Sequence, residues 1–179
     1  MRKKIPPWLI ALVGCVFLMA IGNATHSQES LRTSQALPNH SRAVTEIVAK
    51  TNALRKKVGV PPLTEVTYLT SAAKMHSQEM VHLDYFSHTS PTPGREKPRD
   101  RIQLSGGQDP KIGENIYRAS GLSSEELASR AIAAWEKSPS HYKNIIDSDF
   151  NAVGVGIFAQ GDEFVVTQVF SQQASSSKQ

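Results

Sequence analysis

The sequence predicts a domain of the α+β class, with helices packed on an antiparallel sheet. Two segments with helical periodicity occupy the first half of the 179-residue chain, and a capped helix follows in the second half. The clearest strand pattern comes last, where apolar residues alternate over 153–170 around the turn Gln160-Gly161-Asp162. Because helices and hairpin occupy separate stretches, a regular βαβ alternation is not expected.

The first two helices are predicted by apolar residues that recur at three- and four-residue spacing. One pattern runs from Val44 to Val58 and is stopped by a glycine and two prolines; the second runs from Leu69 to Leu83. His76 lies on the apolar face of the second pattern, so we expect it to be buried and hydrogen bonded. His82 lies off that face and is expected in solvent. A loop is predicted from Ser90 to Arg99, where proline, glycine and charge are dense.

Capping signals predict the remaining helices. After one helical turn over 100–104, a capping box that starts at Ser123 predicts a helix reaching Lys137. Pro139 ends that helix and can begin a short one, with Ser138 as its cap.

Two glycines interrupt the first strand of the hairpin in Val153-Gly154-Val155-Gly156. The run matches part of a dinucleotide-binding fingerprint, but such a fingerprint opens a βαβ unit and this one lies inside a hairpin. We therefore expect Gly154 and Gly156 to let a neighbouring element approach the strand closely. Trp135, on the preceding capped helix, is expected to be buried where that helix meets the sheet.

The N-terminus has the pattern of a secretory signal peptide over residues 1–24. Three basic residues at 2–4 precede an apolar run over 8–21, and small residues favour cleavage after Ala24. Lipidation at Cys15 and a retained anchor stay open as alternatives, because Leu12-Val13-Gly14-Cys15 resembles a lipoprotein box. The pattern predicts a secreted, periplasmic or cell-envelope protein that contacts a membrane only through this segment, if it is retained.

Composition limits what the exported chain can be. Residues 25–40 are polar and predict a flexible linker, and the serine-rich residues 172–179 predict a disordered tail. Cys15 is the single cysteine, so the chain after residue 24 can have no disulfide, thiol nucleophile or cysteine-bound zinc. The formal net charge of +4 falls to about +1 without residues 1–24, which leaves no basic patch for nucleic acid.

Three polar residues are candidates for chemistry. His88 and His141 lie at the ends of predicted helices, where binding groups often occur. Glu114 lies between two isoleucines, and a carboxylate buried there needs a partner. It can form a structural ion pair or a cap, orient an imidazole, or join two histidines around a divalent cation. Spacing alone does not establish a shared site, and HExxH, GxSxG and phosphate-loop motifs are absent from the sequence.

Five motifs in order resemble the CAP superfamily (cysteine-rich secretory, antigen 5 and pathogenesis-related-1 proteins, also called SCP-like), in its bacterial form. They cover about 44–170, so we assign 41–171 to a CAP domain. The motifs are Asn52-Ala53-Leu54-Arg55 with Pro61-Pro62-Leu63; Tyr85-Phe86-Ser87-His88; Gly113-Glu114-Asn115-Ile116; Trp135 with Ser138-Pro139-Ser140-His141; and Val153-Gly154-Val155-Gly156.

The resemblance implies a three-layer α-β-α sandwich with a central, mostly antiparallel sheet. It also implies a cleft in which two histidines and two acids can hold a divalent cation, often zinc. His88, Glu114 and His141 match three of these residues, whereas Ser138 occupies the position of the second acid and Glu136 is expected to point elsewhere. We therefore expect a reduced site, in which water completes the coordination of Zn²⁺ or another divalent cation.

The resemblance leaves three functions open. The first is a non-enzymatic module that binds an extracellular ligand, such as a lipid or a cell-wall component, in the His/Glu cleft or associates with the envelope. The second is a metal-dependent hydrolase of a peptide, ester or cell-wall substrate, with Glu114 as the base. The third is a structural envelope protein whose cleft is vestigial because Ser138 replaces the acid.

Overall fold

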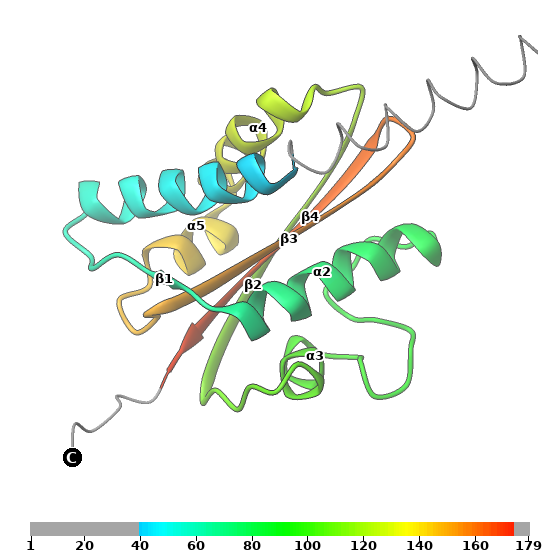
Figure 1. Ribbon diagram of the computed structural model, residues 1–179. Helices are drawn as coiled ribbons and strands as arrows, with labels where there is room; N and C mark the ends of the chain where they lie inside the picture. The colour runs from blue at the N-terminus through cyan, green and yellow to red at the C-terminus, as the bar shows by residue number, and fades with distance from the viewer. Residues whose placement is uncertain (1–39, 174–179) are drawn as a thin grey trace, which may run out of the picture. The chain divides into compact units, whose positions relative to one another are not determined.

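The computed structural model describes residues 40–173. The predicted signal peptide, Cys15, all but the last residue of the predicted linker and most of the predicted tail lie outside these residues. After a helix over 40–57, the chain continues through the following elements (Figure 1): β1 (Thr64–Glu65), α2 (Thr67–His82), α3 (Pro98–Leu104), β2 (Lys111–Ser120), α4 (Ser124–Lys137), α5 (Pro139–Ile146), β3 (Ala152–Gln160) and β4 (Glu163–Gln172).

Four strands form one mixed sheet in the order β1-β3-β4-β2. The predicted hairpin is confirmed as β3 and β4, with Gly161 in the turn at a φ of 61°. Strand β2 pairs antiparallel with β4 along its whole length, while the two residues of β1 pair parallel with β3. Strand β2 has no clean apolar alternation, because Gly113, Glu114 and Asn115 interrupt it, and it was not predicted from the sequence.

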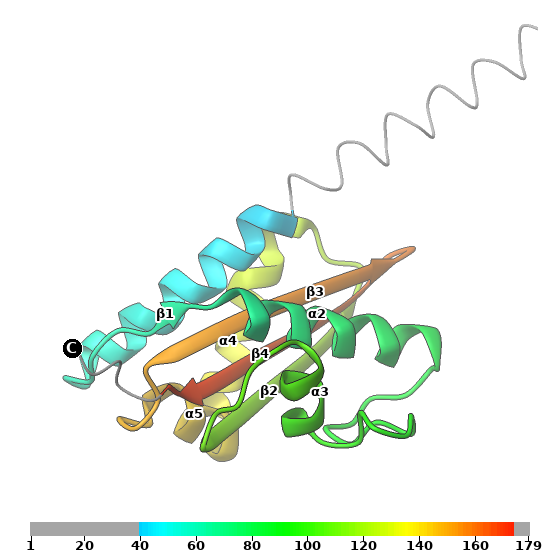
Figure 2. The same ribbon diagram turned by 60° about the horizontal axis from the view of Figure 1, so that its bottom comes forward.

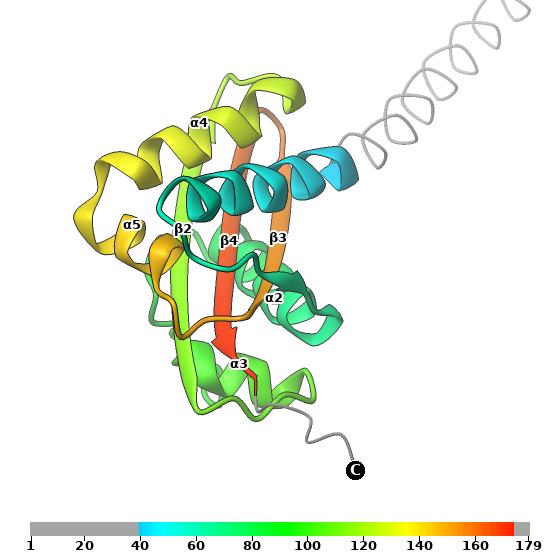
Figure 3. The same ribbon diagram turned by 90° about the vertical axis from the view of Figure 1, so that its left-hand side faces the viewer.

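Helices cover both faces of the sheet, which confirms the three-layer α-β-α sandwich. The helix over 40–57, α4 and α5 lie on one side, and α2 and α3 lie on the other (Figure 3). The larger core lies on the first side and collects apolar residues of these helices and of β3 and β4. Trp135 of α4 is 1% exposed in this core, and its indole Nε1 donates to the carbonyl of Ile116 in β2 at 3.0 Å. The predicted burial of Trp135 against the sheet is therefore confirmed.

The second face of β3 packs directly on the backbone of α2 (Figure 2). A Cβ atom at Gly154 would overlap the main chain of Leu69 and Thr70, and one at Gly156 would overlap that of Ala73 and Lys74. The predicted close approach at these two glycines is confirmed.

Side chains of the helix over 40–57 form hydrogen bonds with the segments just before β1 and just before β3. The buried guanidinium of Arg55 donates to four carbonyls, of which three belong to the end of α5 and the segment after it, at Ile145, Asp147 and Phe150. Asn52 exchanges two hydrogen bonds with the backbone of Leu63, just before β1. These contacts give a structural role to the first of the five motifs.

Several predicted ends of elements need correction. The sequence pattern places Val58 and Leu83 on apolar helix faces, but they follow the ends of their helices and are 46% and 52% exposed. His40 is helical, although it was assigned to the linker. At the other end β4 includes Gln172, and Gln173 accepts and donates hydrogen bonds with Asn151, so the predicted tail begins inside ordered structure.

The capping box at Ser123 is confirmed by reciprocal bonds with Glu126. Ser138 is the N-cap of α5 in backbone conformation, yet its side chain makes no capping bond and its hydroxyl lies 3.2 Å from that of Ser140.

Candidate functional site

A surface cleft of about 510 Å³ lies where the start of β2 meets α5 and the loop before α3. Three residues that the sequence singled out, His88, Glu114 and His141, line this cleft together. They come from three elements that are far apart along the chain, and the fold brings them together. The other lining residues are Pro98, Lys111, Ile112, Ser140, Lys143, Asn144, Asp147 and Phe150.

Glu114 lies at the base of the cleft with a side chain only 3% exposed. Its Oε1 accepts a hydrogen bond from Nδ1 of His88 at 2.9 Å, and its Oε2 accepts one from Nη2 of Arg101 at 2.7 Å. An ionised carboxylate only accepts hydrogen bonds, so Nδ1 of His88 carries the proton of this bond. In the neutral form of the ring, Nε2 of His88, which has no hydrogen-bond partner within residues 40–173, is then the acceptor.

The surroundings of Glu114 keep it ionised. Burial by itself would raise the pKa of this carboxyl group, but the hydrogen bond from His88 and the positive charge of Arg101 together lower the pKa below its ordinary value. Both carboxylate oxygens are occupied by these partners. Glu114 is therefore a weak proton acceptor and a strong hydrogen-bond acceptor.

His141 faces His88 across the cleft, with 6.2 Å between the two ring centroids. Burial lowers the pKa of His141, and the neighbouring His88 lowers it further, so the ring is neutral at pH 7. The backbone at His141 is held by Asn115, whose Nδ2 donates to the His141 carbonyl at 3.2 Å. Asn144 donates in turn to the carbonyl of Glu114 at 3.2 Å and to Oδ1 of Asn115 at 2.9 Å, which links α5 to β2 beneath the two rings.

Ser138 stands apart from the residues that line the cleft, although the resemblance placed it where a second acid is expected. It occupies the N-cap position of α5, where it is half-buried, and the serine that does line the cleft is Ser140. Glu136 is exposed on α4 and does not line the cleft, as its position next to Trp135 predicted.

The far end of the cleft carries charges of both signs. Nζ of Lys111 donates to Asp147 at 2.7 Å and to Asp149 at 2.8 Å. These two bonds raise the pKa of Lys111. Burial would raise the pKa of Asp147, but the bond from Lys111 lowers it overall. Lys143, exposed on α5, adds a second ammonium group to the same end.

Sequence reasoning missed Arg101, which is 1% exposed and is the charged partner of Glu114. It lies in the single helical turn predicted over 100–104, and the one available signal was that a buried Glu114 needs a partner. His76 is fully buried and its Nε2 donates to the carbonyl of Ser87 at 2.9 Å, which confirms the structural role predicted for it. The same nitrogen is 3.8 Å from Oε1 of Glu114.

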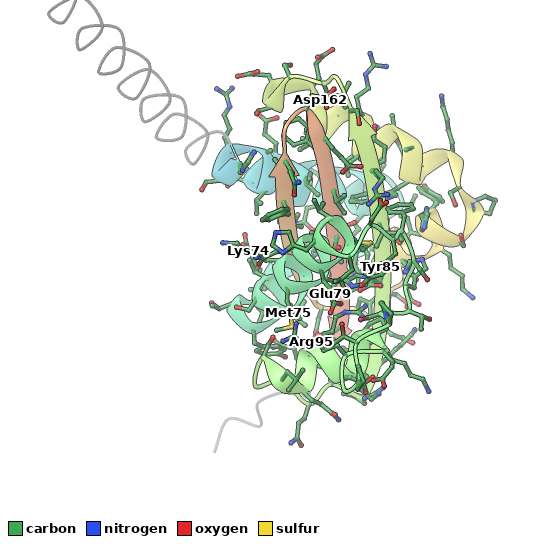
Figure 4. All side chains as sticks on the ribbon, turned by 90° about the vertical axis from the view of Figure 1, so that its right-hand side faces the viewer. Lys74, Met75, Glu79, Tyr85, Arg95 and Asp162 are labelled. Carbon is green, nitrogen blue, oxygen red and sulfur yellow. The ribbon has the colours of Figure 1, made fainter. Side chains whose placement is uncertain are left out.

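A second buried carboxylate lies behind the loop that carries His88. Glu79 accepts a hydrogen bond from the hydroxyl of Tyr85 at 2.9 Å and lies 3.8 Å from Nη1 of Arg95 (Figure 4). Burial would raise the pKa of Glu79, but hydrogen bonds from Thr92, Ser90 and Tyr85 lower it overall. Burial also raises the pKa of Tyr85 to about 12, so the phenol remains a donor.

We expect Glu79 to make stability depend on pH in the acid range. Its pKa is lower in the fold than its ordinary value of 4.5, so its stabilising contribution is complete above that value and is lost as the pH falls through the folded pKa. Glu79→Gln should lower the free energy of unfolding at pH 7 by about 1–2 kcal/mol. The loss should shrink toward pH 3 in urea unfolding series, and a loss that is equal at both pH values would contradict this account.

Within residues 40–173, no group of three or more His, Cys, Asp or Glu side chains is arranged to hold a metal ion. Because Glu114 is bonded to His88 and Arg101, the groups that fit a divalent cation are Nε2 of His88 and the ring of His141. The chemistry of this donor set suits zinc with open positions, and Glu114 occupies the place of a carboxylate that orients a metal-binding imidazole.

A sequence profile of the cysteine-rich secretory protein family, abbreviated CAP, matches residues 48–170. The uncharacterized protein YkwD of Bacillus subtilis (strain 168) is 34% identical over 148 residues, which are 82% of this chain and 54% of YkwD. The chain thus spans about half the length of that relative.

Solved structures share the fold. An extracellular protein containing an SCP domain from Bacillus anthracis str. Ames has 31% sequence identity and a TM-score of 0.63, over 74% of this chain and 41% of its own. An outer surface protein of Borrelia burgdorferi has 20% identity and a TM-score of 0.63, over 74% of this chain and 94% of its own. In the described part of the chain, no helix has the length and apolar character needed to cross a membrane.

Proposed function

Since the chain belongs to the CAP family, we propose that it is an exported, non-enzymatic CAP module that binds an extracellular ligand in the cleft between His88 and His141. Two of its structural relatives are described as an extracellular protein and an outer surface protein, which supports a place outside the cytoplasm or in the cell envelope. The signal pattern of residues 1–24 supports the same location.

One observation carries the proposal: His88 and His141 face each other across one cleft, with the ring of His88 and the backbone of His141 held by hydrogen bonds. Glu114 fixes the ring of His88, and the amides of Asn115 and Asn144 fix the backbone of the segments that bear His141 and Glu114. Neither ring makes a further hydrogen bond within the described residues through the nitrogens that remain. Two imidazoles that face each other across a cleft with unused nitrogens are typical of a binding site.

We propose that the cleft can take a divalent cation, with zinc the best fit, on Nε2 of His88 and on His141. Neutral imidazole is the commonest protein ligand of zinc, and two such ligands leave positions for water or for a ligand group. When bound, the cation would supply a Lewis acid for an anionic or carbonyl oxygen. In this arrangement Glu114 holds the tautomer and direction of His88.

The lining of the cleft is mixed. Lys143 and Ser140 offer hydrogen-bond donors, Lys111 adds a positive charge at the far end, and Pro98, Ile112 and Phe150 supply apolar surface. A cell-wall component, with hydroxyl, amide and carboxylate groups, suits this lining better than a lipid chain. The hydrolase alternative has less support, because Glu114, its expected base, has a lowered pKa and no free oxygen.

Zinc titration by calorimetry tests the site. The purified protein should bind one Zn²⁺ per chain, and His88→Ala/His141→Ala should weaken binding by at least about 100-fold, since even partners behind metal ligands contribute 10–100-fold. The matched control is His82→Ala, because His82 is exposed at the end of α2 and contacts Phe158 instead of the cleft. Equal binding by wild type and double variant, or none by wild type, would contradict a cation site at this cleft.

A further inference from the structure

We infer that Arg101 is the positioning residue for His88: it holds both the backbone and the ring of that histidine in the orientation that the cleft requires. This inference rests on the proposed function, because it concerns the same cleft. Arg101 lies outside the lining of the cleft. It would therefore act only through the groups it holds.

The guanidinium of Arg101 reaches His88 by two routes. Its Nη2 donates to the backbone carbonyl of His88 at 3.2 Å and to Oε2 of Glu114 at 2.7 Å, and the other oxygen of Glu114 binds Nδ1 of His88 at 2.9 Å. One nitrogen of Arg101 thus holds the main chain of His88 directly and its imidazole through a carboxylate. Two points of attachment restrict both the position of the residue and the direction of its ring.

The same guanidinium also closes the loop that carries His88. Nη1 donates to the carbonyl of Arg95 at 2.8 Å and is 3.4 Å from that of Glu96. These carbonyls belong to the segment that leads into α3, which bears Arg101 itself. Both ends of the loop from His88 to Glu96 are therefore hydrogen bonded to the Arg101 side chain, which is 1% exposed.

The charge of Arg101 has a separate consequence for the site. Glu114 is buried, and a buried carboxylate without a countercharge is strongly disfavoured. Arg101 supplies that charge at the oxygen facing away from His88, so the nearer oxygen remains a pure acceptor for the Nδ1 proton. The hydrogen bond at one ring nitrogen decides the tautomer of a neutral histidine, so a neutral His88 ring keeps its proton on Nδ1 and leaves Nε2 as the acceptor.

An arginine is required for this role. Its planar fork directs several donors at fixed angles toward one carboxylate and three carbonyls. A lysine would retain the charge and could satisfy only part of this set, because its ammonium is a single compact donor on a flexible chain. The Arg101→Lys variant therefore keeps the positive charge beside Glu114 and removes the fixed directions of the guanidinium donors.

The test is the ¹⁵N NMR signature of the His88 ring in the metal-free full chain, at about pH 8, where an ordinary imidazole is neutral. The His88→Ala spectrum identifies its signals. The wild type should show His88 protonated at Nδ1 alone. Arg101→Lys should give a mixture of the two tautomers and a 10–100-fold weaker affinity for Zn²⁺. The matched control is Arg99→Gln on the same helix, whose side chain binds the carbonyls of Asp109 and Pro110 and should leave both readouts unchanged.

Two results would overturn the inference. One is a wild-type His88 that is protonated at Nε2 or in both forms, which needs no variant and so holds even if Arg101→Lys does not fold. The other is a folded Arg101→Lys protein in which His88 keeps its single Nδ1 tautomer. Because the tautomer is read without metal, a protein that binds no zinc but loses the tautomer in Arg101→Lys would remove the proposed cation site and leave the role of Arg101 standing.

Discussion

Replacing Gly156 with alanine should destabilise the protein by about 4 kcal/mol or more, which is a large fraction of the total stability of a domain. The added Cβ would overlap the backbone of Ala73 and Lys74, which belong to α2 on the face opposite the larger core. Backbone atoms of a packed helix cannot rotate away, so α2 would have to separate from β3 along its length. Urea unfolding followed by circular dichroism measures the loss.

Gly113→Ala is the matched control, in strand β2 of the same sheet, which β4 separates from β3. A Cβ there would come within 2.9–3.1 Å of Phe150 and Asn144, but it would meet only side-chain atoms and not the backbone of a packed helix. We expect a loss of about 1 kcal/mol, which is in the lower range for overpacking. If the two alanine variants are equally stable, the close packing of α2 on β3 cannot be the reason for glycine at position 156.

Trp135→Ala is expected to lower the free energy of unfolding by about 3–5 kcal/mol. The indole is among the largest fully buried side chains of the domain, and its removal would leave a cavity between α4 and the sheet. It would also leave the carbonyl of Ile116 without its Nε1 donor at 3.0 Å. Thermal and urea unfolding give the loss, and an unchanged midpoint would contradict the packing described above.

Trp135→Phe separates the two parts of this effect. Phenylalanine keeps most of the apolar contact and removes the donor to Ile116, so the loss should be about 1–2 kcal/mol from the hydrogen bond plus a smaller cavity term. Ile116 lies two residues after Glu114 on β2. A shift of β2 would therefore also appear as weaker Zn²⁺ binding in Trp135→Ala, and Trp135→Phe should bind nearly as well as wild type.

The position of the cleft follows from how α5 and β2 meet at one edge of the sheet. Strand β2 is the edge strand beside β4, so its start is open to α5 and to the loop before α3. An edge strand can expose backbone and side chains that a central strand would bury. His88, Glu114 and His141 gather there because each lies at the end of its element or on that edge, which is where a rigid scaffold leaves room for a ligand.

Local patterns were sufficient to predict much of the fold. The capping box at Ser123, the proline that begins α5 and the alternating hairpin depend on interactions within a few residues, and the structure confirms each of them. The close approach of another element at Gly154 and Gly156 could also be predicted from local sequence, because a glycine inside a strand often marks such a contact. Strand β2 could not be predicted in the same way. Glu114 and Asn115, polar residues at the cleft end of the strand, break the apolar alternation that identifies a strand.

The residues of the candidate site could be named from the sequence, but the contacts and distances between them could not. That Glu114 would be buried with a partner followed from its isoleucine neighbours, whereas the partner, Arg101, comes from a different element with no pattern that connects the two. The proton on Nδ1 of His88 and the 6.2 Å between its ring and that of His141 depend on long-range packing. Periodicity and capping are short-range effects, so the sequence by itself determined the elements and the candidate residues. Only the tertiary structure decided which of them meet, because those contacts form when distant segments pack together.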